Sequence, residues 1–216
     1  MINTENITIN LHSSIRINGS KICYFDPFGI EDEINDADIV FITHNHFDHL
    51  DPKSVELISN NNTFMVAPAC IRNQILDESG IDESHCIFMK AGQVLSVNGV
   101  EVTAIAAYNV GKPFHTKESE FLGYVINMDG VKYYVAGDTD ENEDNSSVKC
   151  DVALIPIGGN YTMDYKQAAQ FAADIKPQVV IPTHYGSVVG DAADGEKFAK
   201  IIEQMNIGVE AIIKVH

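Results

Sequence analysis

The stretch that decides the fold is Thr43-His44-Asn45-His46-Phe47-Asp48-His49. It directly follows Asp38-Ile39-Val40-Phe41-Ile42, a nearly all-apolar run typical of a strand buried on both faces. A lone histidine after a strand is usually a capping or surface group. Three histidines and an aspartate in one short stretch instead favour a transition-metal site, because imidazole and carboxylate suit Zn²⁺ and also Fe or Mn.

The spacing within this stretch suits two metal ions. In a loop, the alternate residues His44 and His46 can face one ion. Asp48 and His49 come where the chain turns, toward a second position. We therefore expect a pair of metal sites built on this loop.

The flanking sequence predicts mixed α/β layers. A strong hairpin signal, Asp129-Gly130, separates two apolar runs, and helical segments alternate with short strands on both sides of it. Such hairpins exclude a pure doubly wound parallel sheet. The expected strands are 7–17, 21–25, 38–42, 64–67, 87–88, 93–97, 101–107, 121–128, 131–136, 152–155, 179–181 and 211–213, and the expected helices begin at 51–52, 69, 165 and 193.

Chemistry-bearing residues follow the carboxyl ends of several predicted strands. Ligand sites of α/β sheets gather at such edges, so we expect these residues to lie together. They are His44, Asn109, Asp138, Gly158 and His184.

Composition is that of an ordinary globular chain, with 45% apolar and 21% charged residues in 216. This length favours one domain over residues 1–216. No run approaches the roughly 20 apolar residues of a membrane span. The N-terminus has no basic region or apolar signal core, and the four cysteines form no Cys-x-x-Cys pair, so we expect a soluble, cytoplasmic protein.

The net charge of −17 is the strongest bulk signal. Such a surface repels phosphate backbones, and we therefore do not expect nucleic acid as substrate. The oligomeric state is left open, a homo-oligomer included.

Several segments, in order, resemble the metallo-β-lactamase superfamily over nearly the whole chain. They are the histidine stretch 43–49, His12-Ser13-Ser14, Tyr24-Phe25-Asp26-Pro27, Gly137-Asp138-Thr139 and Pro182-Thr183-His184-Tyr185. His12-Ser13-Ser14 is similar to the hydrolase branch related to ascorbate-6-phosphate lactonases and N-acyl-phosphatidylethanolamine phospholipase D. The resemblance implies a four-layer αβ/βα sandwich with the metals at one edge.

The resemblance also implies a ligand set. The first metal takes His44, His46 and a middle histidine, the second takes Asp48, His49 and His184, and Asp138 bridges them. Where relatives have the middle histidine this chain has Asn109, and the nearest histidine is His115. Either His115 curls back to the metal or Asn109 faces it. We expect His115, because a catalytic zinc usually has three strong protein ligands and an amide is a poor one.

Five further residues are candidates for supporting roles. Asp26 could accept the free N–H of a metal-bound imidazole or simply end a strand. Gly158 and Gly159 could offer backbone N–H groups to a substrate anion or serve the turn. Lys112 and Lys117 could meet an anion, although a solvated loop also explains them. His12 has no assignable role.

Two divalent cations, zinc above all with Mn or Fe as alternatives, can hold a bridging hydroxide at neutral pH, and Asp48 would orient this nucleophile. We therefore expect hydrolysis of an ester, lactone, amide or phosphodiester in a small or medium anionic substrate. One alternative is a nuclease of the tRNA 3′-processing type. The other is a metal-binding or regulatory module without catalysis.

Overall fold

The computed structural model describes residues 2–215, which form two β-sheets with helices outside both. One sheet has the strand order β1-β2-β3-β4-β5-β6 and the other β13-β12-β11-β10-β9-β8-β7. The first consists of β1 (Ile7–Ile9), β2 (Ile15–Asn18), β3 (Ile22–Phe25), β4 (Ile39–Phe41), β5 (Phe64–Pro68) and β6 (Cys86–Met89). The second consists of β7 (Val94–Val97), β8 (Val100–Ala106), β9 (Leu122–Met128), β10 (Val131–Val135), β11 (Val152–Pro156), β12 (Val179–Thr183) and β13 (Glu210–Ala211).

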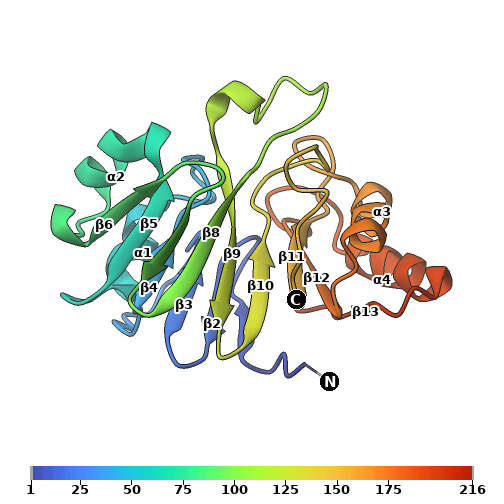
Figure 1. Cartoon of the computed structure of the whole chain (residues 1–216), viewed down its shortest axis with the longest axis horizontal. Coiled ribbons are helices and arrows are strands. Elements are labelled where there is room, and N and C mark those ends of the chain that lie inside the picture. The colour runs from blue at the N-terminus through green and yellow to red at the C-terminus, as the bar shows by residue number, and fades with distance from the viewer. Residues whose placement is uncertain (1, 216) are drawn as a thin grey trace.

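The layers are helix, sheet, sheet, helix, as Figure 1 shows. Helices α1 (Pro52–Ile58) and α2 (Arg72–Glu78) lie outside the first sheet, and α3 (Tyr165–Ile175) and α4 (Asp194–Met205) outside the second. One apolar core joins the facing sheets, and a separate core lies under each helix pair. The predicted four-layer αβ/βα sandwich is confirmed.

Local sequence chemistry explains where the helices and turns begin. Asp51 caps α1 by accepting from the Lys53 N–H, and Pro52 occupies the first turn, where a missing N–H costs nothing. Asp164 and Gln167 form a capping box at α3. The turn between β9 and β10 has positive φ angles at both Asp129 and Gly130, which Asp and Gly tolerate.

The sheets are tied together beside the histidine stretch. Phe25 and Phe41 stack with their ring centroids 4.5 Å apart. Tyr124 on β9 packs against Phe41, and its buried hydroxyl donates to the Ile42 carbonyl oxygen at 2.8 Å. Burying each of these rings contributes about 1.5–3 kcal/mol, so the loop after β4 starts from a rigid platform.

The predicted continuous strand over 7–17 is wrong. The chain folds back at residues 10–14, and β1 and β2 pair antiparallel with Ile9 opposite Ile15. Asn10 and Ser14 close this turn through the Asn10 N–H and the Ser14 carbonyl, 2.8 Å apart, and His12 at its tip has φ +57°. Asn and Ser favour such turns over an extended strand.

Smaller differences concern element ends. The segment after β5 begins as a 3-10 helix, Ala69–Ile71, before α2, and β13 is shorter than predicted and shifted toward the N-terminus. Within residues 2–215, every helix falls short of the length and apolarity needed to cross a bilayer.

Candidate metal centre

The loops that follow β4, β8, β10 and β12 converge at one edge of the sandwich. Three overlapping groups of histidine and aspartate side chains lie there, each with potential ligand atoms within 4.8 Å of one another. These groups are His44/His46/His115, His44/His49/Asp138 and His12/Asp48/His49/His184. Every ligand expected from the sequence belongs to one of them.

The first candidate metal position lies among His44, His46 and His115. The distances from His46 Nδ1 to His44 Nε2 and to His115 Nε2 are both 3.1 Å. Ligands on a tetrahedral zinc with Zn–N bonds of about 2.0–2.1 Å are about 3.3 Å apart. The three nitrogens therefore have the spacing of ligands on one ion.

Asn109 folds the loop that brings His115 back to this position. Its backbone N–H donates to the His115 carbonyl at 2.7 Å, and its side-chain amide donates to the carbonyls of Phe114 at 3.0 Å and Tyr161 at 2.6 Å. His115 has φ +52°, and its Nδ1 lies 3.1 Å from the Tyr161 carbonyl oxygen. That contact fixes the tautomer and leaves Nε2 facing His46.

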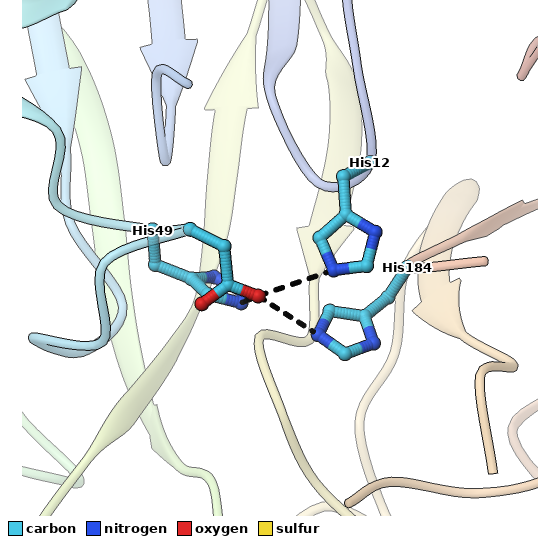
Figure 2. A group of neighbouring side chains, drawn as sticks. His12, His49 and His184 are labelled. Carbon is cyan, nitrogen blue, oxygen red and sulfur yellow. Dashed lines mark ion pairs between the residues drawn. The ribbon is translucent and has the colours of Figure 1, made fainter. Parts of the chain in front are cut away.

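The second position lies among Asp48, His49 and His184 (Figure 2). Asp48 Oδ2 is 3.9 Å from His49 Nε2 and 3.7 Å from His184 Nε2. All three side chains are buried. Gly158 permits this packing, because a Cβ there would stand 2.3 Å from the His184 carbonyl oxygen.

Asp138 lies between the two positions. Its Oδ2 is 3.4 Å from His115 Nε2 and 3.1 Å from His184 Nε2, and its Oδ1 is 3.4 Å from His49 Nε2. The preceding Gly137 has φ +66°, and a Cβ there would make a tight contact of 3.0 Å with Thr43 Cβ. This carboxylate therefore contacts a histidine of the first position, His115, and two histidines of the second, His49 and His184.

Asp26 supports the histidine stretch from below. It is fully buried and accepts from the Thr43 N–H, the Thr43 hydroxyl and His49 Nδ1, each at 2.7 Å. The last contact holds the His49 ring with Nε2 toward the second position. The Asp26 carboxylate therefore links His49 to Thr43.

Burial and neighbouring charges divide the protonation states of the histidines. Burial, with a contribution from His49, holds the pKa of His44 well below its ordinary value, and burial likewise lowers the pKa values of His46 and His115. Burial also opposes protonation of His49, but Asp138 and Asp26 outweigh it and raise its pKa to about 9. Burial opposes ionisation of Asp138, yet nearby imidazoles keep its pKa well below the usual range.

The unpaired atoms of the cluster fit divalent cations. Among the described residues, His12 Nε2, His49 Nε2, His184 Nε2 and Asp138 Oδ1 are buried without a hydrogen-bond partner. An unpaired buried polar atom costs about 1–3 kcal/mol. Four of them facing one space, all from residue types that bind transition metals, are what a metal centre requires.

Three residues considered for substrate contact already bind other groups of the chain. The Gly159 N–H donates to the Met163 carbonyl at 3.0 Å. Lys112 contacts Asp140 at 2.5 Å and the Thr162 carbonyl at 2.7 Å, and Lys117 pairs with Glu143 and Asp144.

Sequence reasoning assigned no role to His12, and it did not consider Ser187 or Tyr161, which hydrogen-bond His12 and His115. Reading residues 7–17 as one strand hid the turn that carries His12 to the centre. The turn formers Asn10, Ser13 and Ser14 were the available signal. Nothing in the sequence marks the Tyr161 carbonyl.

Comparisons with known proteins identify the family of the chain. The family model described as "Beta-lactamase superfamily domain" matches residues 6–184. A UPF0173 metal-dependent hydrolase of Thermococcus onnurineus is 34% identical over 204 residues, covering 88% of this chain and 89% of its own length. One of Methanosphaera stadtmanae is 35% identical over 221 residues, covering 93% and 92%.

The fold recurs in solved structures. A Parabacteroides distasonis protein superposes with a TM-score of 0.80 at 26% identity, over 97% of this chain and 93% of its own. Igni18, a metallo hydrolase of Ignicoccus hospitalis, has a TM-score of 0.79 at 24% identity over 97% and 95%. The chain therefore belongs to the beta-lactamase superfamily and, within it, to the UPF0173 metal-dependent hydrolase family.

Proposed function

We propose that residues 1–216 form one hydrolase domain that cleaves an ester, lactone or phosphodiester bond with two divalent cations, zinc above all. The observation that carries the proposal is the position of Asp138, whose carboxylate contacts His115 of one group and His49 and His184 of the other. A carboxylate in that place can bridge two ions. The first ion would be held by His44, His46 and His115, and the second by Asp48, His49 and His184.

The protein's own groups prepare this chemistry. Bound divalent cations would supply an acidified water and polarise the scissile carbonyl or phosphoryl oxygen. Although burial opposes ionisation, the nearby imidazoles hold the pKa of Asp48 below its ordinary value, so it is a carboxylate at neutral pH. It can accept a hydrogen bond from the attacking water and orient it. Asp26 fixes the ring of His49.

We still propose an anionic substrate, but its negative charge would interact with the metal ions rather than with lysine side chains. Lys112 and Lys117 are both paired with carboxylates. The likeness of His12-Ser13-Ser14 to the lactonase and phospholipase D branch favours a lactone or phosphodiester over an amide.

Apolar side chains on the loops around the centre add a second substrate feature. Most of the exposed large apolar residues among those described are next in sequence to a candidate ligand or to a residue hydrogen-bonded to one, and Tyr161 is itself such a residue. This apolar rim consists of Leu11, Phe47, Val110, Phe114, Tyr161 and Val188. Exposed apolar groups gathered on binding loops mark a contact surface. We therefore propose a substrate with an alkyl or aryl group next to the scissile bond.

This proposal predicts a dependence on acyl chain length. Across p-nitrophenyl esters from acetate to octanoate, kcat/KM should rise about two- to fourfold per added CH₂, because a fully buried CH₂ contributes about 0.8 kcal/mol. Phe47→Ser should flatten this slope, since Phe47 is 69% exposed in the rim. Leu95→Ser, on the edge strand β7, is the control and should leave the slope unchanged. A flat wild-type series would contradict the apolar rim.

The proposed hydrolase activity is tested with the metal-loaded protein on chromogenic esters, lactones and bis(p-nitrophenyl) phosphate. We expect turnover that chelators abolish and that added metal restores. Cleavage of a tRNA 3′ trailer with none of the small substrates turned over would favour the nuclease. Tight binding of two ions without turnover of any substrate would favour the regulatory module.

The affinities of the two positions for their ions should depend differently on pH. His49 has a raised pKa of about 9, so an ion entering the second position must displace its proton. Affinity there should rise by about tenfold per pH unit from pH 7 to 9. Burial keeps the pKa values of His44, His46 and His115 low, so affinity at the first position should stay flat. Chelator-competition titrations measure both constants, and equal slopes would contradict this assignment.

A further inference from the structure

We propose that His12 is a direct ligand of the ion at the second position, which gives that position one more protein ligand than the first. The inference rests on the proposed two-metal centre and adds to it a residue from outside the histidine stretch. Figure 2 shows the His12 ring beside His184, on the turn between β1 and β2, facing the carboxylate of Asp48.

The distances place His12 among the ligands. Its Nε2 is 3.3 Å from Asp48 Oδ2, closer than the corresponding nitrogens of His49 and His184. Potential ligand atoms of all four residues lie within 4.8 Å of one another. Two ligands on opposite sides of one ion are separated by about 4.2 Å, twice a Zn–N bond. The four atoms can therefore surround one ion with little movement.

The orientation of the His12 ring argues for ligation over a hydrogen bond to Asp48. Although Asp48 Oδ2 lies 3.3 Å away, the contact does not have the geometry of a hydrogen bond, and His12 Nε2 has no hydrogen-bond partner among the described residues. The other nitrogen, Nδ1, lies 3.2 Å from the Ser187 hydroxyl. If Nδ1 donates to Ser187, Nε2 carries a lone pair directed into the second position.

The backbone holds His12 in this place at a cost. His12 is fully buried and has φ +57°, a conformation that costs about 1–3 kcal/mol for a residue with a side chain. Its carbonyl accepts from the His184 N–H at 3.2 Å, and the two rings lie 3.9 Å apart. A strained, buried imidazole locked to another ligand fits a functional role.

The consequence is an asymmetric pair of ions. With Asp138 counted for both, the first ion would have four protein ligands, the usual number for zinc, and the second would have five. A water would complete six. The second position would then suit a six-coordinate Mn or Fe ion better than a tetrahedral zinc ion.

The test replaces His12 by Asn, which tolerates a positive φ and so allows the turn to fold. His12→Asn should retain one tightly bound ion and lose about a hundredfold or more in affinity for the second. When Co²⁺ fills both positions, the visible absorption of His12→Asn per bound ion should be stronger than that of the wild type, because the ion at the second position has lost one ligand. Ser187→Ala, which keeps the imidazole, should lose about tenfold. His85→Asn, a histidine outside the centre, is the matched control and should change nothing.

A direct bond is established by ¹¹³Cd-substituted protein labelled with ¹⁵N-histidine. We expect a ¹⁵N–¹¹³Cd splitting on His12 Nε2 that is absent in His12→Asn. Two ions bound to His12→Asn with wild-type affinity would overturn the proposal, and so would weaker binding without that splitting, which would make His12 a positioning residue. Wild-type protein that binds no pair of ions would instead overturn the proposed function.

Discussion

Asp138→Asn is expected to lower kcat/KM by about a thousandfold and to weaken both ions together. The carboxylate contacts histidines from both groups, so its charge acts on both positions. Lewis-acid stabilisation by such a centre contributes several kcal/mol, and about 4 kcal/mol corresponds to about a thousandfold in rate. Asparagine preserves the size of the side chain but removes the negative charge.

Asp140→Asn is the matched control for this variant. Asp140 is also buried, two residues further on, but it pairs with Lys112 and accepts from the Val110 N–H at 3.0 Å. Its loss should leave both metal constants unchanged and the rate within about tenfold, because its partners lie in a supporting loop. Metal titration and steady-state kinetics on both variants measure the difference. Loss of only one ion in Asp138→Asn would argue against a bridging position.

Asp26→Ala is expected to have the largest effect on stability. The substitution removes an acceptor for two groups of Thr43 and for His49, and it leaves them buried without a partner. Breaking a buried, hydrogen-bonded charge costs about 3–5 kcal/mol. Releasing the His49 ring should also weaken the second ion by about 10–100-fold.

Asp36→Ala is the control that shows the effect of removing a carboxylate outside the metal centre. Asp36 also bonds two side chains, Arg16 and Tyr24, but it is partly exposed. We expect a loss of about 1 kcal/mol or less and no change in metal affinity. Urea unfolding in the presence of a chelator measures the stability term without the metal. Equal losses in the two variants would contradict the supporting role of Asp26.

Periodicity and local turn signals were enough to predict mixed α/β layers, whereas the four-layer sandwich was implied by the family resemblance. Asp51-Pro52 and Asp129-Gly130 act within a few residues, and the structure has the helix start and the turn that they predict. The break at 10–14 was harder, because the apolar residues on its two sides continue each other's alternation. The turn formers Asn10, Ser13 and Ser14 were the local signal against one strand, and the bond from the His184 N–H to the His12 carbonyl adds a tertiary contact that the sequence does not show.

The candidate site divides in the same way. His44, His46, Asp48 and His49 are adjacent in sequence, so their grouping was predictable. His115 depends on the side chain of Asn109, which bonds carbonyls of two separate loops and folds one of them back. The sequence favoured His115 over Asn109 from ligand chemistry alone and did not show this folding role of Asn109. His12 follows β1, which runs parallel to β4, so its turn lies at the same edge of the sheet, but no local pattern predicts its approach to Asp48.

The central claim is a pair of ions bridged by Asp138. A crystal structure of the metal-loaded protein, with anomalous maps collected above and below each metal edge, tests it most directly. We predict two peaks: one contacted by His44, His46 and His115, one by Asp48, His49 and His184, and both by Asp138. A single peak, or two peaks of which only one touches Asp138, would contradict the account.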